Sequence, residues 1–573
     1  MPNDTNGGTG MAQLLLTPGA TSVSGGLNDV GGADTVFASN FAGPDDIRHY
    51  FAGYFQDDWK VTPKLTLNLG LRWEYFSPIG EEYGAQANFI PNPPGSAQYV
   101  ITTRRKGDPL SSSFLSTLAK DGIALTYRDQ FGLVNAPKNN LAPRVGLAYQ
   151  ITPKLVAHAA YGIFSAGFED IGGAPDLGEN YPFLYDFSFF APDPGHPISY
   201  PGTSACSAPC LATLENGLAG VALSPTDVNG AGLALQGDQV NFKTPYAQEY
   251  NLTFQYELSP NQTIQVGYLG NNSHHLYSSP NLNVPTVMLP PGTNPQLYVP
   301  FPDFGRGATY VTTQANSYYN SLQFTFERRF SNGLSMLTDY TYAKCRGDDA
   351  NLLGIGNAKG YRAPYLPGFG IKADYGYCGD DTTHVFHYSG TYQLPVGDGK
   401  RFAGSATGAL NQVIGGWSVN WITTLESGLP FTIGCPAGAT TGDFGCNALL
   451  VPGQNIYAGP HNINDFLNAK AFAQPPAATT VGQTDFTPLG GAPTQAHGPG
   501  FHRLDFSLFK DFRTTENTHL EFRGEFFNLT NTPQFSNPSF LDFTNTATFG
   551  RITGLRDGAN DPRQVQFALK FYW

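Results

Sequence analysis

Apolar and polar residues alternate along the chain in segments of about ten residues. The segment 65–76 carries leucine, tryptophan or tyrosine at every odd position, and its even positions from 66 to 74 carry polar residues or glycine. Residues 563–573 repeat this pattern up to the terminal Trp573, and so do the segments around Leu322 and Phe522. A period of two places neighbouring side chains on opposite sides of a strand, so the pattern predicts β-strands with one apolar and one polar face.

The same alternation predicts about 13 strands over most of the chain. We expect them at 49–60, 65–76, 141–151, 155–165, 247–258, 262–274, 318–330, 334–345, 383–395, 415–427, 501–512, 518–530 and 563–573. The connections between them are short and long in strict alternation. Several short ones carry turn chemistry, as in Thr62-Pro63-Lys64 and Ser331-Asn332-Gly333, because proline fixes φ and Asn-Gly supplies the positive φ of a hairpin.

Short turns at one end and long loops at the other are typical of a barrel that crosses a membrane. We therefore predict an all-β fold: a transmembrane, antiparallel, up-and-down β-barrel with short periplasmic turns and long surface loops. Three charged residues on the presumed lipid face, Asp57, Arg328 and Lys510, adjoin short turns, where a strand would leave the hydrocarbon. The alternative is a soluble β-sandwich, whose core strands show the same alternation.

The composition excludes several classes of protein. The 573 residues include 32 Lys+Arg and 45 Asp+Glu, a net charge of −13, so we expect no nucleic-acid partner. Gly 67 and Pro 44 are too many for a helical bundle, and 13% aromatic residues are too many for a disordered chain. No run of about 18 apolar residues occurs, so a membrane location requires a barrel. Residues 1–10 lack the basic and apolar regions of a signal peptide.

The six cysteines form three pairs of sequence neighbours, and each pair falls within one long connection. We predict three local disulfides on the cell surface: Cys206–Cys210, Cys345–Cys378 and Cys435–Cys446. The premise is that a surface loop buries no core of its own and is stabilised by a bridge that restricts its unfolded chain. Free thiols are an alternative. A metal site at Cys206 and Cys210 is another, although further ligands do not follow closely.

No constellation of residues indicates catalysis, so we expect neither an enzyme nor a cofactor. His384 and His387 resemble a metal pair, but residues three apart point to opposite faces of a strand. The pairs Asp348-Asp349 and Asp380-Asp381 flank cysteines, and a Ca²⁺ site there is an alternative to solvated loop charges. The favoured expectation is that the chain holds no metal.

A group of charges is expected on the polar face near the C-terminus. We predict a lumenal charge network in which Arg523 lies between Asp505, on the preceding strand, and its own neighbours Glu521 and Glu525. Solute contact and acid/base catalysis are the alternatives to this structural role in the wall.

Several segments together form a recognisable set. They are Tyr54-Phe55-Gln56-Asp57-Asp58-Trp59-Lys60, Ala142-Pro143-Arg144-Val145-Gly146-Leu147-Ala148-Tyr149, Tyr161-Gly162-Ile163-Phe164, Gly415-Gly416-Trp417, Ser427-Gly428-Leu429-Pro430-Phe431-Thr432, Leu504-Asp505-Phe506-Ser507-Leu508-Phe509-Lys510 and the closing segment 563–573. In this order they resemble the barrel of Oar-like TonB-dependent receptors, and the resemblance covers about residues 45–573.

The resemblance implies an outer-membrane location, a barrel of about 22 strands, a plug domain and uptake of a bulky nutrient that is energised by TonB. The chain shows no plug or TonB box, so we expect TonB to act only through a missing N-terminal region. We expect residues 1–48 to be a surface-loop-like lead segment and residues 49–573 to be the C-terminal part of the barrel. The terminal aromatics Phe571 and Trp573 resemble the signal that the barrel assembly machinery reads.

An odd count of about 13 strands does not close a bacterial barrel. We therefore expect an N-terminally incomplete barrel that does not transport alone. It would form a curved open sheet, or a smaller closure in which residues 1–48 add a strand. The leading functional hypothesis is TonB-dependent uptake of a carbohydrate or peptide. The alternatives are an outer-membrane adhesion or secretion-support protein and a soluble β carbohydrate-binding protein. The expected partners are outer-membrane lipid, the assembly machinery and an unknown extracellular solute.

Overall fold

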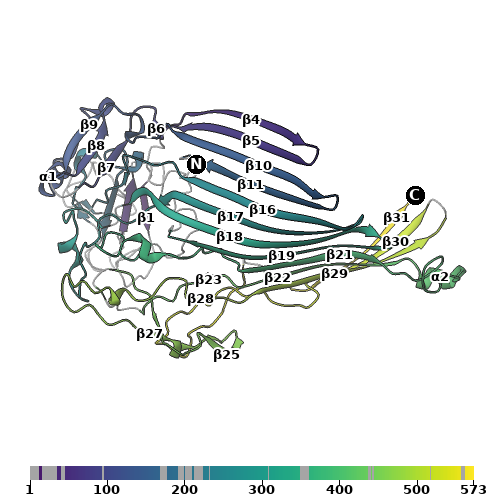
Figure 1. The fold of residues 1–573 in the computed structure, drawn as a ribbon. Helices are drawn as coiled ribbons and strands as arrows, with labels where there is room; N and C mark the ends of the chain where they lie inside the picture. Colours follow the sequence, from purple (N-terminus) through teal and green to yellow (C-terminus); the bar gives the residue numbers. More distant parts are fainter. Residues whose placement is uncertain are drawn as a thin grey trace.

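The fold is dominated by one large antiparallel sheet in which spatial order follows sequence order (Figure 1). The computed structural model describes residues 12–15, 35–39, 45–92, 96–167, 177–190, 199–200, 210–211, 224–231, 233–306, 309–348, 361–436, 441, 444–515, 518–556 and 562–573. The main path of the sheet contains β4 (Tyr50–Thr62), β5 (Leu65–Phe76), β10 (Asn140–Thr152), β11 (Leu155–Ser165), β16 (Tyr246–Ser259), β17 (Gln262–Ser278), β18 (Tyr310–Ser331), β19 (Leu334–Gly347), β21 (His384–Gln393), β22 (Trp417–Glu426), β29 (Phe501–Arg513), β30 (His519–Phe527) and β31 (Gln564–Tyr572). Two short strands, β15 (Gly237–Asp238) and β20 (Gly376–Tyr377), add to β18 and β19.

All the predicted strands are present, and most boundaries agree within a few residues. The largest difference is at β17 and β18, which extend well past the predicted 262–274 and 318–330 toward the long loops. Their pairing shifts register between Ser273 and Leu276, which interrupts the strict alternation. A pattern with a period of two therefore does not predict the extended parts of these strands.

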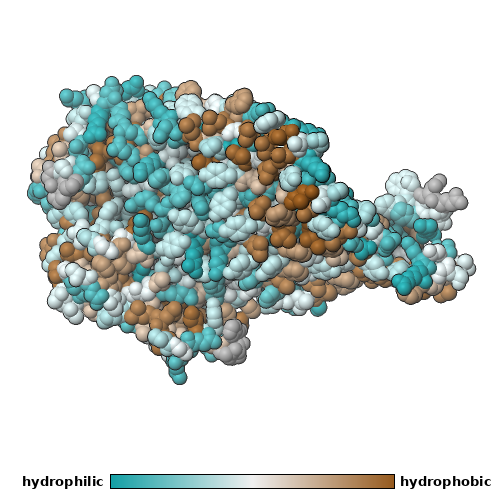
Figure 2. All heavy atoms as spheres, in the orientation of Figure 1, coloured by the Kyte–Doolittle hydropathy of each residue, from teal (hydrophilic) through white to brown (hydrophobic). Residues whose placement is uncertain are grey.

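The register fixes which side chains share a face of the sheet, because directly opposed residues lie on the same side. Leu69 opposes Val145, which opposes Tyr161, and this row is apolar. The adjacent row places Arg144 on the other face, in line with Glu249. Figure 2 shows hydrophobic residues gathered over the strands. The predicted division into an apolar and a polar face is therefore present in the folded chain.

The sheet is curved, and β4 and β31 form its two borders (Figure 1). Among the strands that the structure describes, β4 pairs only with β5 and β31 only with β30. Of the two predicted arrangements, the structure thus has the curved open sheet.

Part of the lead segment 1–48 is described. Its β1 (Ala12–Leu15) pairs with β2 (Thr35–Ser39), and β2 pairs in turn with β12 (Asp186–Phe190), which belongs to a long connection. β3 (Asp46–Ile47) pairs with β6 (Gly80–Glu81), at the start of another long connection. These strands therefore associate with the loops and add no strand to the large sheet.

The long connections fold into a layer at one end of the sheet, which we call the loop layer (Figure 1). It contains β7 (Ala87–Ile90), β8 (Gln98–Thr102), α1 (Ser112–Lys120), β9 (Ala124–Arg128), β13 (Ser199–Tyr200), β14 (Cys210–Leu211), β23 (Pro430–Phe431), β24 (Leu449–Leu450), β25 (Tyr457–Asn462), β26 (Asp465–Leu467), β27 (Phe472–Ala473) and β28 (Ala496–His497). Its 3-10 helices lie at Thr103–Arg105, Phe131–Leu133, Leu177–Glu179, Pro225–Asp227, Pro295–Tyr298, Ile371–Asp374, Ala469–Ala471 and Thr487–Leu489. At the opposite end, α2 (Gly408–Ile414) lies in the connection between β21 and β22. No helix in the described ranges is long and apolar enough to cross a membrane.

The loop layer has hydrophobic cores, so the premise that surface loops bury no core is wrong for this chain. Phe114 of α1 packs in one cluster with Tyr99, Tyr181 and Phe304, which come from three different long connections. A second cluster around Ile433 joins residues 431–496 to residues 543–552. Apolar side chains from separate connections complete each other's cores, which no single loop could do.

A buried arginine pairs with a carboxylate of its own connection and also binds the backbone of a second one. The side chains of Arg362 and Asp374 are 8% and 2% exposed, and Arg362 Nε lies 2.6 Å from Asp374 Oδ1. The guanidinium also donates to the backbone carbonyls of Ala373, Leu489 and Gly491. The charge is therefore both paired and hydrogen-bonded, as burial requires.

Arg362→Met is expected to destabilise the loop layer by about 3–5 kcal/mol, because it leaves the buried Asp374 carboxylate without a cation. Hydrogen exchange of residues 361–376 and 489–491 measures this loss. Arg329→Met is the matched control, because the Arg329–Glu327 pair is 70% and 47% exposed, and the change should stay below about 1 kcal/mol. Equal protection from hydrogen exchange in Arg362→Met and in the wild-type protein would contradict the stabilising role of Arg362.

A carboxylate at the end of α1 makes the loop layer sensitive to pH. Asp121 Oδ2 accepts a hydrogen bond from the backbone N–H of Asp303 at 3.1 Å. Burial raises the pKa of the Asp121 carboxyl to about 6, and the nearby Asp303 carboxylate adds to this rise. Because an unfolded aspartate titrates near pH 4, folding favours the protonated form of Asp121.

The contribution of Asp121 to the stability of the loop layer should therefore be fully present below about pH 4. It should be lost as the pH rises through about 6. Asp121→Asn is expected to remove this part of the pH dependence, because the amide stays neutral and its oxygen still accepts from Asp303. Urea denaturation at several pH values measures it, with Asp129→Asn, at an exposed carboxylate, as control. A pH profile that Asp121→Asn leaves unchanged would refute the role of this carboxyl.

Candidate functional site on the polar face

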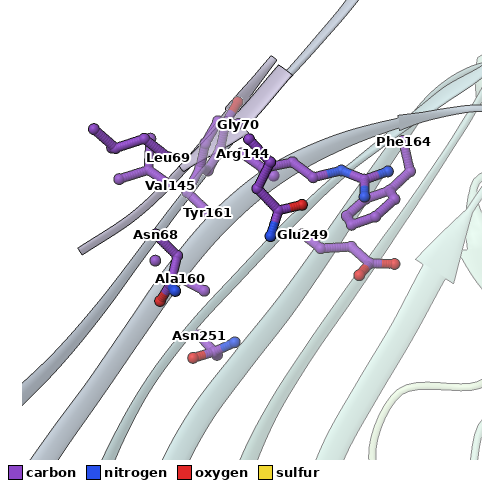
Figure 3. A pocket seen from close by; sticks show the side chains of 13 residues that line it. Asn68, Leu69, Gly70, Arg144, Val145, Ala160, Tyr161, Phe164, Glu249 and Asn251 are labelled. Atoms are coloured by element: carbon purple, nitrogen blue, oxygen red, sulfur yellow. The ribbon is translucent and has the colours of Figure 1, made fainter. Parts of the chain in front are cut away.

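A hollow among the strands of the polar face is the candidate site, because it combines opposite charges with open space (Figure 3). In the β-sheet register, Gly70 and Gly162 lie on either side of Arg144, and Glu249 follows Gly162. The two glycines have no side chain, so space stays open beside the arginine. The resulting cavity has a volume of about 350 Å³.

The groups that line the cavity can bind a polar solute. Arg144 stacks its guanidinium on Phe164, with 4.4 Å between Cζ and the ring centroid. Glu249 accepts a hydrogen bond from Asn271 at 3.3 Å and retains other lone pairs. Gln56, Asn68 and Asn251 add amides, and the other lining residues are glycines or apolar and aromatic residues. One cation, one anion and several amides form a set that suits hydroxyl and amide groups of a ligand.

A second group of charges, which the sequence-based expectations do not include, lies on the same face at the N-terminal end of the sheet. Arg72 Nε lies 2.8 Å from Glu74 Oε1, and the Tyr50 hydroxyl donates to the same carboxylate at 2.6 Å. Arg72 and Glu74 are two residues apart in a strand, which places them on one face. The spacing of Arg72 and Glu74 in the sequence is enough to predict their pairing. The contact of Tyr50 cannot be predicted in this way, because it depends on the register of β4 against β5.

The predicted C-terminal network is only partly assembled. Glu521, Arg523 and Glu525 share the polar face with Asp505. Arg523 pairs with Glu521 and lies over Phe509, with 4.9 Å from Cζ to the ring centroid. Glu525 instead accepts a hydrogen bond from Gln566.

Asp505 does not belong to the contacts of Arg523. The register opposes Arg523 to Phe509, so Asp505 lies four residues away along β29. Asp505 pairs with Arg503 at 3.0 Å and accepts from the backbone N–H of Asn528 at 2.7 Å. The predicted diagonal contact is wrong because it required a pairing of β29 with β30 that the turn does not produce.

The structure contains two of the three predicted disulfides, Cys345–Cys378 and Cys435–Cys446, with Cα–Cα distances of 5.4 and 5.5 Å. Cys206 and the side chain of Cys210 lie outside the described residues. Asp380 lies close to the first pair. The two sulfur atoms are bonded to each other there and are not available to a metal.

The acidic residues near the disulfides mainly satisfy the backbone. Asp348 accepts from the N–H of Asn316, and Asp381 from the N–H of Cys345, both at 2.6 Å. Burial raises the pKa of Asp348, while the hydrogen bond from Asn316 opposes that rise. Asp349 lies outside the described residues. A Ca²⁺ site at these residues stays an untested alternative.

The remaining sequence-predicted residues lie at separate places on the sheet. His384 opposes Tyr342 on the apolar face, and His387 opposes Asp339 on the polar face, so the two histidines do not face one site. At the C-terminus, Phe571 stacks on Trp573, with ring centroids 6.1 Å apart. Trp573 is 90% exposed, so its indole is accessible to another protein or to lipid.

Comparisons with known proteins agree with this architecture. The family model described as "Outer membrane beta barrel domain" matches residues 9–566. No curated protein matches the sequence.

Three solved structures illustrate the similarity. A variant of the ferric enterobactin receptor PfeA from Pseudomonas aeruginosa has 9% identity and a TM-score of 0.40, over 92% of this chain and 45% of that chain. The siderophore receptor PirA from Acinetobacter baumannii has 10% identity and a TM-score of 0.37, over 96% and 50%. The ferric citrate transporter FecA has 11% identity and a TM-score of 0.37, over 94% and 46%. The chain thus spans half the length or less of these proteins.

Peptide mapping of the non-reduced protein is expected to find Cys345–Cys378, Cys435–Cys446 and, as the sequence predicts, Cys206–Cys210. Reduction should destabilise residues 435–446 by about 2–4 kcal/mol, because the bridge restricts the unfolded loop. Faster proteolysis of that loop after reduction measures the effect, and cleavage in residues 98–128, which contain no cysteine, is the internal control. A bridge between two different long connections would contradict the local pairing.

Proposed function

Because the chain belongs to the outer membrane beta barrel domain family, we propose that it forms part of the wall of a TonB-dependent receptor that takes up a bulky solute. Family membership confirms the predicted barrel class and the outer-membrane location. It also excludes the soluble alternative. The observation that carries the proposal is the polar face of the sheet. It contains an open cavity beside Arg144, and the folded loop layer lies at one end of the same sheet.

The open borders of the sheet support a larger parent barrel. Bacterial single-chain barrels close with an even number of strands, and an unpaired strand edge is not tolerated in lipid. We propose that residues 49–573 are the C-terminal part of the barrel and that further strands fill the space between β4 and β31. Residues 1–48 would then belong to the surface loops.

Two protein partners follow from the same proposal. TonB would act through a region N-terminal to this part of the barrel, because the resemblance to TonB-dependent receptors places the plug and TonB box there. The barrel assembly machinery would read the C-terminal strand, whose apolar side ends in Phe571 and the exposed Trp573.

The chemistry of the cavity favours a carbohydrate or a peptide as the solute. Arg144 and Glu249 contribute opposite charges, and Gln56, Asn68 and Asn251 contribute amides. Such a lining offers donors and acceptors without a strong net field, which suits neutral ligands that are rich in hydroxyl or amide groups.

Adhesion is the second candidate function, and one observation favours it. The loop layer has its own hydrophobic cores and the buried Arg362–Asp374 pair, so it can present a fixed surface to a partner outside the cell. An adhesin would bind through these loops and would move no solute across the membrane.

Uptake by cells that produce the full-length receptor distinguishes the two functions. With fluorescent oligosaccharides and oligopeptides as probes, we expect accumulation that is lost when TonB is deleted. Gly70→Leu should lower the uptake rate roughly tenfold or more by filling the cavity and separating the solute from Arg144, because a hydrogen bond to a charged group contributes about 1.5–3 kcal/mol. A Cβ at Gly70 meets no atom closer than 3.6 Å, so the barrel should still fold.

Gly53→Leu is the matched control, because Gly53 lies on the apolar face and a Cβ there meets nothing within 4 Å. It should leave uptake unchanged. Probe binding at the cell surface that is insensitive to TonB, without accumulation inside, would support adhesion and contradict the transport proposal.

A further inference from the structure

The connection between β21 and β22 differs from the other turns at its end of the sheet. Most of those turns are tight, whereas residues 394–416 form a longer excursion that contains α2 and projects beyond the strands (Figure 1). Phe402, Leu410 and Val413 are 56%, 58% and 66% exposed. Leu410 and Val413 are three residues apart in α2 and therefore share one side of the helix. The turn thus presents apolar side chains on the periplasmic side.

Two hydrogen bonds tie the end of α2 to the apolar face of the sheet. Trp417 Nε1 donates to the carbonyl of Val413 at 2.9 Å, and Lys510 Nζ donates to the carbonyl of Gly415. Trp417 and Lys510 oppose each other in the register and lie on the apolar face, in line with Phe522. The C-terminal end of α2 is therefore held next to the apolar face of the sheet.

The polar side of the turn contacts the protein itself. Asn411 Oδ1 accepts from the backbone N–H of Asp398 at 2.8 Å, and Gln412 donates to the carbonyl of Arg513 at 2.8 Å. These contacts use the amide groups of α2 within the chain. The helix is left with an apolar side that the described residues do not cover.

Positive charge lies beside the apolar side chains. Lys400 and Arg401 are exposed, and the Arg401 guanidinium lies 5.6 Å from the centroid of the Phe402 ring. Lys510 is buried beside them, with Nζ 4.8 Å from the ring centroid of Phe512 and 5.4 Å from that of Trp417. Cations with long apolar stems next to aromatic rings are typical of the boundary between hydrocarbon and headgroups.

We propose that residues 394–416 form an amphipathic anchor that lies in the headgroup layer of the periplasmic leaflet and binds anionic phospholipid. Phe402, Leu410 and Val413 enter the acyl boundary, and Lys400 and Arg401 contact the headgroup phosphates. The anchor holds the β21–β22 hairpin at a fixed depth in the membrane. It rests on the outer-membrane location of the chain and is independent of solute uptake.

Photo-crosslinking in outer-membrane vesicles tests the anchor in the full-length protein. Benzoylphenylalanine is placed at Val413, at Leu322 in the apolar band, and at Leu450 in the loop layer, all of which are exposed. We expect phospholipid adducts at Val413 and Leu322 and none at Leu450. An adduct of Val413 with a periplasmic protein, or no lipid adduct at Val413 when Leu322 gives one, would overturn the proposal.

Trypsin cleavage after Lys400 and Arg401 tests the preference for anionic lipid. In phosphatidylcholine vesicles that contain phosphatidylglycerol, cleavage should be roughly tenfold slower or more than in phosphatidylcholine alone, since each basic residue adds to the attraction. The double variant Leu410→Ser/Val413→Ser should lose this protection, whereas Leu450→Ser should keep it. Heat-modifiable gel mobility shows that each variant is folded. Equal cleavage rates of the wild-type protein in both lipids would overturn the anionic-lipid assignment.

Discussion

One continuous hydrogen-bonded register, which runs from β4 to β31, is the constraint on which the rest of the structure depends. In hydrocarbon every backbone N–H and C=O needs a partner, and only the neighbouring strands can supply it. Since side chains alternate, a slip of one residue would exchange the two faces. Arg144 would then face lipid, where a charge at the bilayer midplane costs about 2–4 kcal/mol. Pairing of the backbone and separation of the faces therefore enforce each other.

The two ends of this frame serve different purposes. At the loop end, side chains such as Phe114 and Phe304 join connections that are far apart in sequence. Arg362 links its own connection to the one that contains Leu489. At the other end most turns are tight, and α2 is the exception. In the proposed function, the loop layer with its own cores would contact the solute or partner outside the cell. In the proposed anchor, the α2 turn would lie in the periplasmic leaflet.

The strands could be predicted because a period of two is visible in a single sequence, as in residues 65–76. The loop cores could not, because Phe114 meets Phe304 only after separate connections fold together, and no local pattern encodes that contact. Register was the second limit. The pairing of Glu521 with Arg523 follows from their spacing within one strand, whereas the position of Asp505 depends on how β29 pairs with β30. The hollow beside Arg144 likewise needs glycines from two other strands.

The central claim is that alternate residues of each strand face lipid and the lumen, and β18 allows the most direct test. Nitroxide labels at each of positions 322–327 of the full-length protein in bilayers report accessibility to oxygen, which concentrates in lipid, and to a water-soluble nickel complex. The account predicts high oxygen accessibility at 322, 324 and 326 and high nickel accessibility at 323, 325 and 327. Accessibility that varies smoothly along β18, without a period of two, would contradict it.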